Sequence, residues 1–97
     1  MLQWFDAAHA QDFGRELAKF YSDRVPFDPP FSKKQFAVKT QETLQKLDLK
    51  IQQFKAKDKL NLYKKAKLGN AFKWELRDKQ YDVTYVDELT EWLMHRL

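Results

Sequence analysis

The 97-residue sequence contains no cysteine and only two glycines. The first absence excludes disulfide bonds, thiolate metal sites and cysteine nucleophiles, and it is typical of proteins from a reducing compartment. The two glycines are isolated, which excludes glycine-rich loops that bind phosphates or dinucleotides. No window approaches the roughly 18 apolar residues of a membrane span, and no basic leader precedes an apolar run. We therefore expect a cytoplasmic protein without a signal peptide or membrane contact.

Residues that carry catalysis or bind metals are also sparse. The two histidines, His9 and His95, lie at opposite ends of the sequence. Asp12 and Glu91 are within one helical turn of them, but such pairs are ordinary surface contacts. Zinc-ligand spacing, an HExxH motif and a nucleophile motif are all missing. We expect a protein that is not an enzyme, with no catalytic residues, metal site or cofactor.

All three prolines fall in the segment VPFDPPF, residues 25–31. Proline lacks a backbone donor and restricts the preceding residue, so this segment is predicted to be a fixed connector between helices. A helix near 6–24 is predicted before it, with Asp6 as the N-cap. The apolar stripe of this helix has helical spacing and comprises Ala10, Phe13, Leu17, Phe20 and Tyr21.

A second helix is predicted near 32–57, where Ser32 and Gln35 have the spacing of a capping box. Its seam has near-heptad spacing, as in helices packed along their length, and comprises Phe36, Thr40, Leu44, Leu47, Ile51 and Phe54. A helix of this length spans roughly 38 Å. We expect part of it to project beyond the core or to pack against a second copy.

A narrow basic stripe runs beside that seam and comprises Lys39, Lys46, Lys50 and Lys57. Such a stripe could follow a phosphate backbone or an acidic partner helix. The simpler interpretation is that the lysine stems cover the edge of the seam while the charged ends stay in water.

A third helix is predicted near 59–79, with Asp58 as its cap, but its apolar residues surround the axis. One broad side comprises Leu62, Ala66, Leu68, Gly69, Phe72 and Leu76, and the other comprises Leu60, Tyr63, Ala71 and Trp74. An alternative is a hairpin near 72–86, because Phe72, Trp74 and Leu76 alternate, as do Tyr81, Val83 and Tyr85. The helix is favoured by composition and by the lack of a primed-turn dipeptide.

The last helix is predicted near 83–96, after an Asp82 or Thr84 cap. Its seam comprises Val86, Leu89, Leu93 and Leu97. The sequence therefore predicts an all-α fold, a small four-helix bundle-like single domain that covers residues 1–97. The alternative fold is α+β with the hairpin.

Charge is unevenly distributed along the chain. Residues 1–31 carry a net charge of −2, residues 32–79 carry +9, and residues 80–97 carry −3. One interpretation is that the acidic ends fold back onto the basic middle, for example with Asp87, Glu88 and Glu91 beside Lys64, Lys65 or Lys67. Otherwise the basic middle faces an anionic partner.

The segment LYKKAKLGNAFKW, residues 62–74, interleaves lysines with aromatic rings. Tyr63 and Trp74 lie three helical turns apart and share a side of the predicted helix with Lys59, Lys67, Asn70 and Arg77. The simplest interpretation is that this helix is buried on two sides. The alternatives are an exposed surface for a protein partner or for single-stranded nucleic acid, whose bases stack on such rings.

Taken together, these patterns predict a non-catalytic helical module for protein interactions, one that could self-associate as a homodimer. The alternative function is nucleic-acid binding through the basic and aromatic segment 55–79, which contains nine basic and three acidic side chains. The sequence identifies no protein partner.

Overall fold

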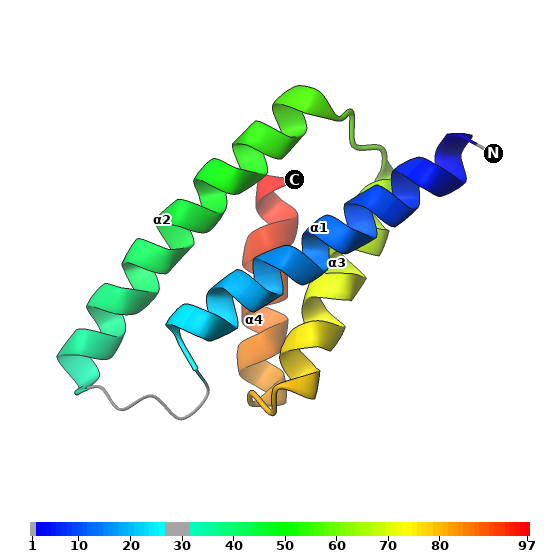
Figure 1. The fold of residues 1–97 in the computed structure, drawn as a ribbon. Helices are drawn as coiled ribbons and strands as arrows, with labels where there is room; N and C mark the ends of the chain where they lie inside the picture. Colours follow the sequence, from blue (N-terminus) through cyan, green and yellow to red (C-terminus); the bar gives the residue numbers. More distant parts are fainter. Residues whose placement is uncertain (1, 27–31) are drawn as a thin grey trace.

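The computed structural model describes residues 2–26 and 32–97, and side chains from residue 7 onward within these ranges. In these residues the chain forms four helices and no strand (Figure 1). They are α1 (Leu2–Arg24), α2 (Lys33–Lys57), α3 (Leu62–Asp78) and α4 (Val83–Arg96). The predicted all-α, four-helix bundle-like fold is confirmed. The alternative hairpin near 72–86 is wrong, because its first half continues α3 and its second half opens α4.

Two of the predicted helix starts are confirmed by their caps. The Ser32 hydroxyl accepts from the Gln35 N–H at 3.2 Å, and the Gln35 side chain accepts from the Ser32 N–H at 3.1 Å. This reciprocal pair is the predicted capping box. Asp82 caps α4, since its carboxylate accepts from the Tyr85 N–H at 3.2 Å.

Two other predicted caps are wrong. Asp6 lies inside α1, which begins at Leu2, because residues 2–6 contain no glycine or proline to interrupt the helix. Asp58 ends α2 rather than starting α3, and its N–H donates to the Phe54 carbonyl at 2.9 Å. The N-cap of α3 is Asn61, whose side chain accepts from the Lys64 N–H at 2.8 Å. Asn and Asp cap equally well, so composition alone favoured neither.

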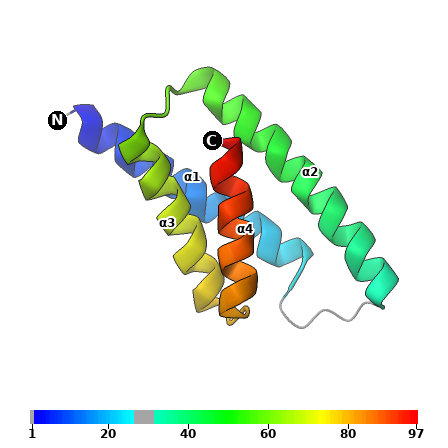
Figure 2. The same cartoon turned by 180° about the vertical axis from the view of Figure 1, so that it is seen from behind.

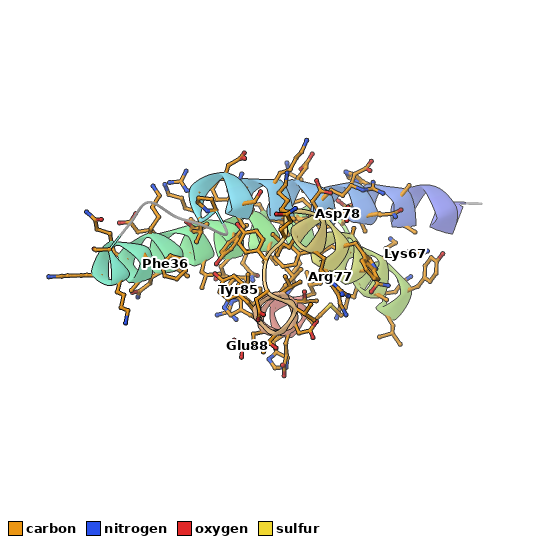
Figure 3. All side chains as sticks on the ribbon, turned by 90° about the horizontal axis from the view of Figure 1, so that it is seen from below. Phe36, Lys67, Arg77, Asp78, Tyr85 and Glu88 are labelled. Carbon is orange, nitrogen blue, oxygen red and sulfur yellow. The ribbon has the colours of Figure 1, made fainter. Side chains whose placement is uncertain are left out.

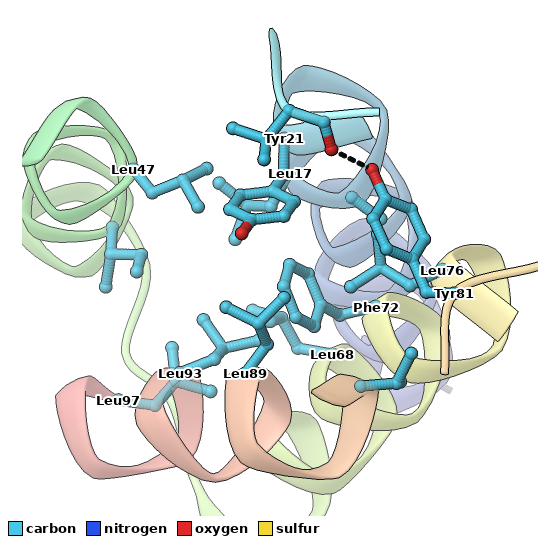
Figure 4. Packing of buried hydrophobic residues seen from close by; sticks show 14 of the residues in the cluster. Leu17, Tyr21, Leu47, Leu68, Phe72, Leu76, Tyr81, Leu89, Leu93 and Leu97 are labelled. Atoms are coloured by element: carbon cyan, nitrogen blue, oxygen red, sulfur yellow. Dashed lines mark hydrogen bonds between the residues drawn. The ribbon is translucent and has the colours of Figure 1, made fainter. Parts of the chain in front are cut away.

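Helices α1 and α3 form the closest pair, with α4 packed against α3 and α2 against α1 (Figures 1 and 2). Figure 4 shows that side chains from all four helices converge on one core. The largest fully buried side chains include Leu17, Tyr21, Leu47, Leu68, Phe72, Leu76 and Leu93. Burial of each such side chain contributes about 1.5–3 kcal/mol before entropy costs are counted.

Helix α2 is fully buried only in its middle turns, and Phe36 and Phe54 nearer its ends are partly buried against the core. Its buried residues are Thr43, Leu47 and Ile51, while both ends carry exposed side chains. Near the C-terminal end of α2, the Phe54 ring stacks on Phe13 of α1, with centroids 4.1 Å apart and planes 4° apart. A helix longer than its buried segment agrees with the expected projection. Its packing against a second copy stays a prediction.

The connector predicted at 25–31 lies largely outside the described residues. Val25 is described, fully buried, and its N–H donates to the Tyr21 carbonyl at 2.8 Å. The α3–α4 connection contains Gln80, which has a positive φ of 69°. This is the left-handed conformation that glycine usually provides after a helix.

Candidate interaction surface

The orientation of α3 is set by a row of buried side chains. Leu68, Phe72 and Leu76 recur every four residues and are fully buried in the core. Because residues at this spacing share one helical face, the opposite face of α3 points to solvent. Figure 3 labels Lys67 at the edge of α3.

That solvent side carries five residues of the predicted surface. They are Tyr63, Lys67, Asn70, Trp74 and Arg77, and we call them the α3 outer face. Successive members are four, three, four and three residues apart, which is a heptad repeat. None of them is acidic. A second helix lying along α3 would meet these positions in turn.

Both aromatic rings of the α3 outer face are accessible. Tyr63 is 53% exposed and Trp74 is 55% exposed. Six large hydrophobic side chains are exposed among the described residues, and three of them lie on α3: Leu62, Tyr63 and Trp74. Exposed aromatic rings concentrated on one helix are typical of a binding surface.

Each ring is paired with a cation from the same helix. The Lys67 Nζ lies 5.6 Å from the centroid of the Tyr63 ring, and the Arg77 Cζ lies 4.9 Å from that of Trp74. Exposed pairs of this kind are worth about 0.5–1 kcal/mol. The contacts restrict the rings and leave both positive charges near the surface.

Lys59, the sixth predicted residue, is outside this helix. It is exposed in the connection before α3, where its carbonyl accepts from the Lys64 Nζ at 3.0 Å. The structure therefore places five of the six predicted residues on one face and the sixth before the helix begins.

The interpretation that α3 is buried on two sides is wrong for Tyr63 and Trp74. The assignment of two other residues to its sides was also wrong. Ala71 is buried against α1, where Gly14 leaves room for it, and Leu62 is 84% exposed. Apolar residues surround this helix, so only the packing partner decides which of them face the core.

Two lysines of the predicted basic stripe on α2 lie beside α1. The Lys50 Nζ lies 4.7 Å from the centroid of the Phe20 ring of α1. Lys50 and Lys57 line a groove of about 520 Å³ between α1 and α2, together with Asp12 and Glu16 of α1. Lys39 is half-buried, and Lys46 is exposed. This arrangement agrees with lysine stems that cover the edge of a seam.

One acidic side chain of the C-terminal segment pairs with the basic middle: Asp87 of α4 lies 3.5 Å from the Lys73 Nζ. In a second pair the charges are reversed, since Asp48 of the basic middle lies 3.5 Å from the Nε of Arg96 in the C-terminal segment. Asp87 therefore pairs with Lys73 in place of the expected Lys64, Lys65 or Lys67. Such partly exposed pairs contribute about 0–1 kcal/mol each.

His9 lies 3.8 Å from Asp58, whereas its predicted neighbour Asp12 pairs with Arg15 at 3.0 Å. Within the part of the chain that the structure describes, His, Asp and Glu side chains form no group of three or more placed to hold a metal ion.

A cluster of three tyrosines was missed by sequence reasoning. The Tyr21 and Tyr85 hydroxyls form a hydrogen bond with each other. The Tyr81 hydroxyl donates to the Val25 carbonyl, and this bond is the dashed line in Figure 4. The Tyr81 and Tyr85 rings stack with centroids 5.8 Å apart. Burial raises the pKa of all three tyrosines, and the contact with Tyr85 raises the pKa of Tyr21 further. Helical periodicity placed Tyr21 on the apolar stripe of its helix but gave no sign that it meets Tyr85.

No family model, curated protein or solved structure matches this chain. None of the helices in the described residues combines the length and apolarity needed to cross a membrane.

Proposed function

We propose that this chain is a non-catalytic protein-interaction module whose binding surface is the α3 outer face. The observation that carries this proposal is the exposure of Tyr63 and Trp74 on an acid-free heptad repeat. Aromatic residues and arginine are enriched at the centres of protein interfaces. A cytoplasmic location, in keeping with the lack of cysteine, is part of the proposal.

Single-stranded nucleic acid is the second candidate, because exposed rings beside cations can stack on bases and contact phosphates. The spacing of the rings favours a protein instead. Tyr63 and Trp74 are eleven residues apart, or roughly 16 Å along the helix, so two neighbouring bases could not stack on both rings. A partner helix has the same repeat as α3 and can contact both.

Site-specific photo-cross-linking in a lysate of the protein's own cells tests the proposal. A photoreactive phenylalanine analogue replaces Trp74 in one variant and Leu49 in the control. Leu49 is 64% exposed on α2, so the two probes have similar access to solvent. We expect discrete protein adducts from position 74 and few from position 49. Equal labelling at both positions, or adducts with nucleic acid alone, would contradict the proposal.

A further inference from the structure

The order of side chains along the α3 outer face is self-complementary. From Tyr63 to Arg77 the face presents an aromatic ring, a cation, an amide, an aromatic ring and a cation. Read in the opposite direction, every ring takes the place of a cation. We propose that this face binds a second copy of the chain, with the two α3 helices antiparallel about a two-fold axis at Asn70. This inference rests on the proposed function, because it names the partner of the same surface.

The register of such a pair follows from residue numbers. When Asn70 lies opposite Asn70 of the second copy, Tyr63 lies opposite Arg77, and Lys67 lies within one residue of Trp74. The two-fold axis makes each of these cation–ring contacts twice, as in any isologous interface. The heptad spacing keeps all five positions on the shared seam.

The rings have room for a second cation. In its own chain each ring has one cation over it, at 5.6 Å for Tyr63 and 4.9 Å for Trp74. Both rings are still more than half exposed, so ring surface remains for the cation of the second copy. Desolvation at an interface strengthens a cation–ring contact beyond its value at an exposed site.

Asn70 favours the antiparallel orientation. Its side-chain amide both donates and accepts, so two such amides can pair across a two-fold axis. A single asparagine on a helix seam is also a known device for fixing register and orientation. In a parallel pair, Lys67 would face Lys67 and Arg77 would face Arg77, which places like charges together.

The charge of the surface distinguishes a second copy from other partners. Two α3 outer faces bring together Lys67 and Arg77 from each copy with no acid among them, so the copies repel weakly. Salt screens that repulsion, since the Debye length is about 10 Å at 0.1 M. Self-association should therefore be maintained or strengthened as salt rises. Binding to an acidic protein or to nucleic acid should weaken instead.

Disulfide trapping tests the register directly, because the chain has no other cysteine. Asn70→Cys places one thiol at the axis, whereas in the control, Arg77→Cys, the two thiols lie roughly 21 Å apart along the helices. We expect mild oxidation to cross-link Asn70→Cys at least about ten times faster, since a disulfide needs Cα atoms within about 7 Å. Mixing Tyr63→Cys with Arg77→Cys should give a mixed dimer. Equal rates for the two single variants would overturn the proposed register.

Sedimentation equilibrium, with loading concentrations up to about 1 mM, tests the association itself. An interface of one helix from each copy is small, so we expect a weak, reversible dimer. Trp74→Ala should weaken it at least about tenfold with the circular dichroism spectrum unchanged. A strictly monomeric wild-type chain would overturn self-association alone, while protein adducts from position 74 would still support the proposed function. If the chain is monomeric and position 74 also gives no protein adducts, the proposed function and the proposed self-association are both contradicted.

Discussion

Gly14 of α1 lies directly against the backbone carbonyl of Leu68 in α3. A Cβ added at Gly14 would overlap that carbonyl oxygen and would lie 3.1 Å from the Ala71 Cβ. The two helices approach closely there because position 14 has no side chain. The contact also explains why Ala71, rather than Trp74, faces α1.

Gly14→Ala should therefore destabilise the fold. The added methyl group meets backbone, which cannot move without separating α1 from α3. Overpacking of this kind typically costs about 1–3 kcal/mol. Urea unfolding followed by circular dichroism should show a lower midpoint with little change in slope.

Gly69→Ala is the matched control, because its Cβ would lie 2.5 Å from the Sδ of Met94, the flexible part of a long side chain. Met94 can change rotamer, and alanine is favoured over glycine within a helix by about 1 kcal/mol. We expect this variant to be near neutral or slightly stabilised. An equal loss of stability in Gly14→Ala and Gly69→Ala would show that the close approach of α1 and α3 is not what makes Gly14 necessary.

Gln80→Gly should raise the free energy of unfolding. The φ of 69° at Gln80 costs a residue with a Cβ about 1–2 kcal/mol, whereas glycine adopts it freely. The greater freedom of glycine in the unfolded chain offsets part of this gain. A net increase of about 0.5–1 kcal/mol is expected from thermal or urea unfolding. Gln80→Ala keeps the Cβ and should give no such increase.

The tyrosine cluster should make stability fall at high pH. Burial raises the pKa of Tyr21, Tyr81 and Tyr85 in the folded state. Above about pH 10 the unfolded tyrosines lose their protons while the folded ones keep them, so alkali favours unfolding. Below that pH the contribution is fully present. Each tyrosine adds a slope of up to about 1.4 kcal/mol per pH unit.

Tyr81→Phe removes the contribution of one tyrosine to this pH dependence. The variant also loses the hydrogen bond to the Val25 carbonyl, so it should be less stable at neutral pH by about 1 kcal/mol. Its free energy of unfolding should nevertheless fall less steeply than that of the wild type between about pH 10 and pH 11. Lysines titrate in both proteins and cancel in the comparison. Parallel curves would contradict the assigned shift.

Single-stranded oligonucleotides should bind no more tightly than about 10⁻⁴ M at physiological salt, the weak end of non-specific affinity. Fluorescence anisotropy measures this directly. Tighter binding that is lost in both Lys67→Glu and Trp74→Ala would instead favour the nucleic-acid alternative. In that case Lys67→Glu should also reduce the salt dependence, whereas Trp74→Ala should leave it nearly intact.

The four helices could be predicted because seams and caps are local patterns. Ser32 and Gln35 are three residues apart, so their box is visible in the sequence. The buried side of α3 could not be predicted in the same way, because Gly14 of a distant helix admits Ala71 and leaves Trp74 outside. The tyrosine cluster could not be predicted either, because Tyr21 belongs to α1 and Tyr85 to the distant helix α4.

The attachment of α2 by its middle turns bears on how the molecule opens. Most side chains of its end turns are exposed, and its partner α1 is already packed against α3 on another side. Backbone amides near the ends of α2 should therefore exchange with deuterium sooner than those of Leu68 to Phe72. Partial unfolding that begins in α2 would uncover Leu47 and Ile51 while the α1–α3 contact at Gly14 stays closed.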